Sequence, residues 1–195
     1  MAAGIAAAAG RVVTFGLGLG YYAFMAAAKE NVSRVTVIEK NPDVIALFET
    51  YILPQFPFAD KIEIIEADAF QFLEETEDGA YDFGYADFWE GAEDGTLLYL
   101  EFLQKAKRFT RTEFAYWIES AFIDVYFRPA ALLCFRRACG EPPFPLDASK
   151  KMRRLQDHFA DFLSERVAEI PNPRAFLSCQ NLTPLVREWA TREGL

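Results

Sequence analysis

Three glycines stand at alternate positions at the end of a short apolar run, in the sequence RVVTFGLGLG over residues 11–20. The residues before Gly16 are β-branched or aromatic, as in a buried strand, whereas the segment after Gly20, YYAFMAAAK, favours helix. Glycines at such a strand-to-helix turn let the backbone fold tightly against a ligand, and the first amides of the helix can bind it. The pattern predicts a nucleotide-binding turn at Gly16, Gly18 and Gly20.

Acidic side chains follow the next three strands expected along the chain. Glu39 ends the run VTVIE about twenty residues after the glycines, where nucleotide-binding βαβ units place an acidic residue that binds the ribose hydroxyls. Asp68 follows KIEIIE, and Asp87 and Glu90 follow the apolar run over 81–86. Because the carboxyl ends of parallel strands meet at one edge of a sheet, we expect Gly16, Glu39, Asp68 and Asp87 at the same edge.

The first half of the chain contains the elements needed to position these residues. Strands are expected over 12–15, 34–39, 61–66, 81–86 and 113–119, with helices over 21–29, 43–53, 69–76 and 96–109. Asn41 and Pro42 supply an N-cap and a first helical residue. Asp82 falls at the edge of the sheet opposite to the candidate site and is expected to be a turn residue. Strands that alternate with helices predict an α/β fold with a doubly wound, mostly parallel sheet.

The spacing of the glycines separates two classes of nucleotide fold. Dinucleotide-binding turns have the pattern G-x-G-x-x-G, which would require glycine at Tyr21. The region 11–109 instead resembles the class I S-adenosylmethionine-dependent methyltransferases, nearest to the spermidine synthase-like branch. The resemblance rests on the segments VVTFGLGLG, VTVIEKNPDVIALF, IIEADAFQFL and YDFGYADFWEG. It implies a Rossmann-like methyltransferase fold and, as cofactor, S-adenosylmethionine or decarboxylated S-adenosylmethionine.

The resemblance also implies roles for individual residues. The three glycines and Glu39 would hold the cofactor. Asp68 would receive the adenine amino group, with the backbone at Ala69 facing the ring. Asp68 is equally suited to cap the helix that follows it, and the two roles are compatible.

Asp87 and Glu90 are the candidate catalytic residues, because spermidine synthases place an aspartate here that draws the proton from the attacking amine. The loop departs from that family's pattern, since Phe88, Trp89 and Glu90 stand where small hydroxyl residues and a second aspartate are usual. For the two aromatic residues, packing is favoured over substrate stacking. Thr14 is a second departure, because many methyltransferases have an acidic residue two places before the first glycine.

Three functions stay open at this stage. The favoured one is methyl transfer to a small molecule by an S-adenosylmethionine-binding protein, with Asp87 as amine orienter or base. The alternatives are aminopropyl transfer from decarboxylated S-adenosylmethionine and a non-catalytic cofactor-binding or scaffold domain. NAD binding is disfavoured by Tyr21.

The second half of the chain has a less regular pattern. Residues 122–139 are apolar and mixed, 148–168 carry a helical pattern, and Thr183-Pro184 is expected to start a last short helix. The antiparallel hairpin usual in the family is not found. We predict a single domain over residues 1–195, with a cofactor-binding α/β core over 1–120 and a divergent helical C-terminal extension over 121–195.

Charge and composition restrict the partners. The net charge of −9 argues against sequence-independent nucleic-acid binding. Between Asp60 and Glu101 there are fourteen acidic residues and one base, Lys61, which makes a cationic amine a candidate substrate, although solvated helix faces explain most such runs. A small-molecule substrate is therefore expected, and a homodimer stays open.

The residues that usually bind metals or form disulfides are scarce. The chain has one histidine and three cysteines without C-x-x-C spacing, so we expect no metal site and a reducing, cytoplasmic location. The alanine-rich start has no basic residue before it, and Arg11 interrupts it, so neither a signal peptide nor a membrane span is predicted. We expect a short helix there, packed beside the first strand.

Overall fold

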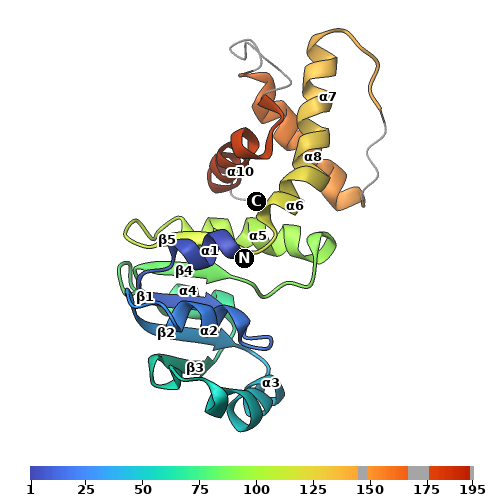
Figure 1. Ribbon diagram of the computed structural model, residues 1–195. Coiled ribbons are helices and arrows are strands. Elements are labelled where there is room, and N and C mark those ends of the chain that lie inside the picture. Colours follow the sequence, from blue (N-terminus) through green and yellow to red (C-terminus); the bar gives the residue numbers. More distant parts are fainter. Residues whose placement is uncertain (145–148, 167–175, 194–195) are drawn as a thin grey trace. The chain divides into compact units, whose positions relative to one another are not determined.

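The structure is a computed structural model, and it describes residues 1–144, 149–166 and 176–193 (Figure 1). The chain forms two compact units. The first consists of Met1–Glu90 and Lys105–Trp117, and the second of Gly91–Gln104 and Ile118–Leu195. All the candidate site residues lie in the first unit.

A five-stranded parallel sheet forms the first unit (Figure 1). Its strands are β1 (Gly10–Phe15), β2 (Val32–Glu39), β3 (Ile62–Glu66), β4 (Phe83–Ala86) and β5 (Glu113–Tyr116), in the order β3-β2-β1-β4-β5. All four strand pairs are parallel, which confirms the predicted doubly wound sheet. The chain order reverses between β1 and β4, and ligands of such sheets bind at the carboxyl ends beside this reversal.

The helices of this unit follow the strands as predicted. They are α1 (Ala2–Ala7), α2 (Tyr21–Ala27), α3 (Pro42–Leu47), α4 (Ala69–Glu75) and the last residues of α5 (Ala92–Ala106). The expected helix over 43–53 becomes α3 followed by a π-helical turn, η1 (Phe48–Ile52), and a short 3-10 turn that contains Pro54. The N-cap at Asn41 is confirmed, because its side chain accepts a hydrogen bond of 3.0 Å from the amide of Asp43.

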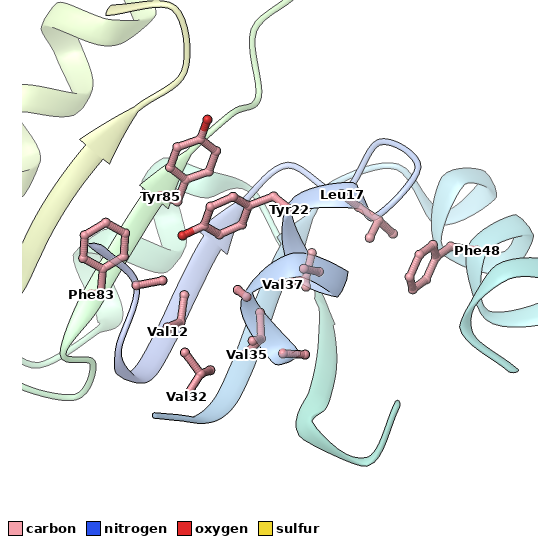
Figure 2. Close-up of a cluster of buried hydrophobic side chains, with 13 residues drawn as sticks. Val12, Leu17, Tyr22, Val32, Val35, Val37, Phe48, Phe83 and Tyr85 are labelled. Atoms are coloured by element: carbon pink, nitrogen blue, oxygen red, sulfur yellow. The ribbon is translucent and has the colours of Figure 1, made fainter. Parts of the chain in front are cut away.

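One face of the sheet carries the apolar cluster drawn in Figure 2, and α1 and α2 cover that face. The parallel register places Val12 beside Val35 on one side and beside Phe83 on the other, so the three side chains share this face. Each such side chain contributes about 1.5 to 3 kcal/mol when buried. The opposite face holds an apolar cavity of only about 10 Å³, lined by Phe15, Leu73 and their neighbours. A cavity of that size holds at most one water molecule, so it is not a ligand site.

Asp82 lies in the bend just before β4, which agrees with the turn position expected from the sequence. Its carboxylate accepts a hydrogen bond of 2.7 Å from the backbone amide of Arg11 and pairs with the guanidinium of the same residue at 3.1 Å. Both side chains are half exposed, so solvent screens the ion pair and it contributes little to stability. The bond to the backbone joins the starts of β1 and β4, at the edge opposite to the glycine turn.

All the regular secondary structure described in the second unit is helical. After the start of α5 it contains α6 (Glu119–Phe122), the π-helical turn η4 (Ile123–Phe127), α7 (Arg128–Ala138), α8 (Lys150–Ser164) and α10 (Cys179–Glu193). Phe127, Phe159 and Trp189 form its aromatic core, with ring centroids 5.2 to 5.8 Å apart. In the described residues no strand follows β5, in agreement with the missing hairpin signal.

Two expectations for this unit concern helix ends. The helix expected over 148–168 is found as α8, and the remainder at both ends lies partly outside the described residues. The prediction that Thr183-Pro184 starts the last helix is wrong, because α10 begins at Cys179 and contains Pro184. Ser178 accepts a hydrogen bond from the amide of Asn181 at the start of α10, so this polar residue, rather than the proline, marks the helix start. None of the helices in the described ranges has the length and apolar composition needed to cross a bilayer.

Candidate functional site

The three glycines form the turn between β1 and α2, and their φ angles are all positive, at 95°, 51° and 75°. A Cβ atom on Gly16 would lie 2.0 Å from the carbonyl oxygen of Asp87, and one on Gly20 would lie 2.1 Å from the ring of Phe48. On Gly18 a Cβ atom would meet no atom within 4 Å. Gly16 and Gly20 therefore close the turn against the protein, whereas Gly18 leaves open space beside the backbone.

The backbone amides of the turn show the same contrast between Gly16 and Gly20, which bond to the protein, and Gly18, which does not. The amide of Gly16 donates to Ile38 O at 2.8 Å, and that of Gly20 donates to Leu17 O at 2.8 Å. Among the residues that the structure describes, the exposed amides of Gly18 and Leu19 donate to no acceptor. Two backbone donors at the tip of the turn are thus available to a ligand.

Glu39 connects the glycine turn to the end of β2. Its Oε2 accepts a hydrogen bond from the amide of Leu17 at 3.0 Å, and its Oε1 accepts one from the amide of Asn41 at 2.9 Å. Each carboxylate oxygen can accept a second hydrogen bond, so the ribose role predicted for Glu39 is compatible with these contacts. The link to Leu17 was not predicted, because it depends on a side-chain conformation that spacing alone does not fix.

Asp68 caps α4, as one of its two predicted roles required. Its Oδ1 accepts hydrogen bonds from the amides of Phe70 at 2.9 Å and Gln71 at 3.2 Å. Ala69, the first residue of α4, is buried. The adenine role of Asp68 and Ala69 stays a prediction, and the cap shows how the carboxylate is oriented before a ligand binds.

Substitutions at Asp68 can separate the cap from the ligand role. Asp68→Ala removes the cap and should lower the free energy of unfolding by about 1 kcal/mol. Asp68→Ser keeps a capping oxygen, so its stability should stay close to that of the wild type, while its affinity for S-adenosylmethionine should fall about tenfold. Denaturant unfolding measures the change in stability, and calorimetry measures the change in affinity. An unchanged affinity in Asp68→Ser would show that Asp68 caps α4 and does not bind the ligand.

Asp87 follows β4 directly beside the glycine turn. Its backbone amide donates to Phe15 O at 2.8 Å, and its carbonyl is the group that Gly16 approaches. The side chain is half-buried, and this burial raises the pKa of Asp87 to about 6, because desolvation disfavours the charged form. A carboxyl group with a pKa near neutrality is suited to exchange a proton with an amine. Glu90, by contrast, is exposed.

The aromatic residues between these two acids are held by packing, as favoured from the sequence. Trp89 is buried, and its Nε1 donates to the carbonyl of Trp117 at 3.2 Å. The ring of Phe88 meets that of Phe70 edge to face at 5.6 Å. The loop after β4 is therefore held to the end of β5 by Trp89 and to α4 by Phe88.

Thr14, the other departure from the family pattern, is 1% exposed. Its hydroxyl has no hydrogen-bond partner among the described residues. A carboxylate in this position would be desolvated at high cost, so a neutral side chain suits the burial. Sequence reasoning also missed Tyr85, which lies beside Thr14 in the register of β1 and β4. Its position two residues before Asp87 was the available signal.

No protein-family model matches this sequence, and a search of curated proteins finds no match. The chain is similar to the spermidine synthase of Thermotoga maritima, at 18% identity and a TM-score of 0.45 over 58% of this chain and 39% of that one. It is also similar to a conserved hypothetical protein of Streptococcus pyogenes (18% identity, TM-score 0.39, 50% and 59% of the two chains). A third similar structure is the Trypanosoma brucei PRMT1 enzyme-prozyme heterotetrameric complex with AdoHcy, at 16% identity and a TM-score of 0.40 over 57% of this chain and 34% of that one.

The chain spans less than two thirds of the length of each of these proteins. The likeness concerns the fold alone. The strand order and the glycine turn give the first unit a Rossmann-like, methyltransferase-like fold.

Proposed function

We propose that this chain binds S-adenosylmethionine at the carboxyl ends of β1 and β2 and transfers its methyl group to a small molecule, with a cationic amine as the candidate acceptor. One observation carries the proposal. The glycine turn is open at Gly18 and is closed at Gly16 against the backbone of Asp87, whose half-buried carboxyl has a raised pKa. The open side of the glycine turn and a group able to exchange protons thus lie at the ends of two neighbouring strands, β1 and β4.

The residues of the turn fit the proposed cofactor. The amides of Gly18 and Leu19 would face its polar end, Glu39 retains acceptor capacity for the ribose, and Asp68 would face the adenine. Bound S-adenosylmethionine supplies an electrophilic methyl group on a sulfonium ion. The nucleotide roles of Glu39 and Asp68 need no movement of the backbone, because both side chains are already fixed by amide hydrogen bonds.

Asp87 would act on the acceptor. In its ionised form it holds a protonated amine, and it takes up the proton that the amine loses before the nitrogen attacks. Methyl transfer would require the acceptor nitrogen to be unprotonated, and Asp87 would hold the proton that the nitrogen has lost. Most of the acceleration comes from holding the two reactants in line.

Aminopropyl transfer from decarboxylated S-adenosylmethionine is the second candidate, because the same carboxylate suits a polyamine acceptor. The buried Trp89 in the loop after Asp87 weighs against it, since aminopropyltransferases of the spermidine synthase type have small hydroxyl residues in this loop. We also infer a cytoplasmic location, since all three cysteines are free thiols.

Calorimetry and turnover assays test the proposal together. Wild-type protein is titrated with S-adenosylmethionine and with its decarboxylated form, then incubated with a panel of amines, and products are identified by mass spectrometry. Binding and a methylated product support methyl transfer, whereas an aminopropyl product supports the second candidate. Binding without any product would show a non-catalytic domain, and no binding by folded protein at millimolar ligand would contradict the cofactor site itself.

A further inference from the structure

Tyr85 is a central residue of β4, and its hydroxyl is buried without a hydrogen-bond partner among the described residues. The residue is 1% exposed. Its ring is stacked on that of Tyr22 from α2, with centroids 3.9 Å apart and planes 9° apart. On α1, Gly4 allows a close approach, because a Cβ atom there would lie 2.6 Å from the ring. The ring is therefore fixed by both helices, and so is the position of its hydroxyl.

An unpaired buried hydroxyl is unfavourable, because the group gives up its water without regaining a hydrogen bond. Phenylalanine would fill the same space without that cost. The neighbouring Tyr22 does not supply the partner, since its own hydroxyl donates to the carbonyl of Gly4 at 3.3 Å. The hydroxyl of Tyr85 thus requires a partner that the two aromatic residues do not provide.

Asp87 does not bond this hydroxyl directly, but it is the charged group that acts on Tyr85. It follows Tyr85 by two residues, so the strand direction carries both side chains on the face that α1 and α2 cover. In Figure 2 the oxygen of Tyr85 points away from the labelled valines. Burial, and after it the charge of Asp87, raises the pKa of Tyr85, so the phenol stays protonated and keeps a proton to donate.

We propose that Tyr85 is the positioning residue of Asp87, and that one buried water joins them, accepting a hydrogen bond from the Tyr85 hydroxyl and donating one to the Asp87 carboxylate. The contact fixes one carboxylate oxygen and leaves the other for an acceptor. This second part rests on the proposed function, whereas the hydrogen bond itself does not depend on any cofactor.

Few other ionisable groups face the pair. On α2 the phenol of Tyr22 lies against Tyr85, and at the start of α1 the amino group of Met1 lowers the pKa of Asp87, opposing the larger effect of burial. The neighbouring strands present only uncharged residues beside Tyr85, namely Thr14 on β1 and Ala115 on β5. Substitution of Tyr85 leaves all of these in place, so a changed titration reports on its hydroxyl.

Carbon-13 NMR of the Asp87 carboxyl in the cofactor-free protein tests the proposal, with Asp87→Asn identifying the signal. A hydrogen bond to the charged form lowers a pKa, so Tyr85→Phe should raise the proton affinity of Asp87 roughly threefold to tenfold. Tyr22→Phe removes a hydroxyl from the same stack and should leave the midpoint unchanged. If the titration midpoint of Asp87 is unchanged in folded Tyr85→Phe, the proposal is overturned and Tyr85 serves packing alone.

The wild-type protein provides a second measurement, in case Tyr85→Phe does not fold. The ring carbon that bears the Tyr85 hydroxyl should shift with pH at the Asp87 midpoint, near the pKa of about 6, and the shift should vanish in Asp87→Asn. A Tyr85 chemical shift that does not change at the Asp87 midpoint would contradict the proposed contact. Neither titration needs S-adenosylmethionine, so failure of cofactor binding and failure of the Tyr85 contact are separate results. If transfer occurs, Tyr85→Phe should lower kcat and leave the KM for the cofactor unchanged.

Discussion

Replacing Gly16 by alanine is expected to lower the free energy of unfolding by at least about 3 kcal/mol, which would leave little folded first unit. Two costs add at this position. The φ angle of 95° is unfavourable for any residue with a side chain, and the new methyl group would lie 2.0 Å from the Asp87 carbonyl oxygen. The clash cannot be relieved cheaply, because the amide of Asp87 is tied to Phe15 O. Circular dichroism during denaturant unfolding measures the change.

Gly18→Ala is the matched control in the same turn. Its φ of 51° lies in the left-handed region, and its Cβ atom meets nothing within 4 Å, so the expected cost is only about 1 kcal/mol. The folded variant should nevertheless bind S-adenosylmethionine about tenfold more weakly, because the added methyl group occupies the open space proposed for the ligand. Equal stability of the Gly16→Ala and Gly18→Ala variants would contradict the assignment of Gly16 to the contact with Asp87.

Asp87→Asn is the second substitution with a large expected effect. It should lower the activity and raise the stability of the protein at high pH. Removing the base should lower transfer roughly 100-fold to 10,000-fold. The folded-state pKa of about 6 lies above the value of about 4 usual for aspartate, so the ionised form is penalised in the folded protein. Stability from the protonated form is therefore present below pH 4 and is lost as the pH rises to about 6. At pH 8 the amide should be more stable by about 1 to 2 kcal/mol, a value reduced because the carboxyl is only half-buried.

Melting temperatures at pH 4 and pH 8 measure this difference, which should be visible only at the higher pH. Glu90→Gln serves as the control, because the side chain of Glu90 is exposed and its neutralisation should change stability far less than that of the half-buried Asp87. A variant Asp87→Asn that is no more stable at pH 8 would show that the carboxyl is solvated. Loss of activity in Glu90→Gln equal to that in Asp87→Asn would extend the proton-accepting role to Glu90.

The glycine turn and the strands of the first unit could be predicted from the sequence for local reasons. Positive φ angles require glycine, and β-branched runs bounded by turns favour strands. What the sequence could not reveal depends on distant partners. The contact of Glu39 with Leu17, the pairing of Asp82 with Arg11 and the stacking of Tyr22 on Tyr85 each join elements whose neighbourhood follows from the strand order, which no local pattern specifies.

The helical half of the chain was less predictable for a different reason. Residues 122–139 are apolar on several sides, because η4 and α7 are packed between other helices, and such runs have no clear period. The start of α10 is predicted too late from the sequence, because Pro184 is expected to be a first helical residue. A proline is tolerated inside a helix when neighbouring groups compensate for the lost hydrogen bond. The hydroxyl of Thr183 donates to the carbonyl of Cys179 at 2.9 Å, one turn before it, and so helps to hold this first turn.

The division of α5 decides how the protein can be cut into fragments. The chain enters the second unit at Gly91, leaves it after Gln104 and enters it again at Ile118. A fragment that ends at Trp117 would keep all five strands, yet it would deprive Tyr99 of Phe122, its ring partner at 5.1 Å, and of Glu119, which accepts its hydroxyl hydrogen bond. The apolar side chains of α5 would lose these contacts, and the fragment should aggregate. The two units are thus discontinuous in sequence, and no single cleavage point yields either of them intact.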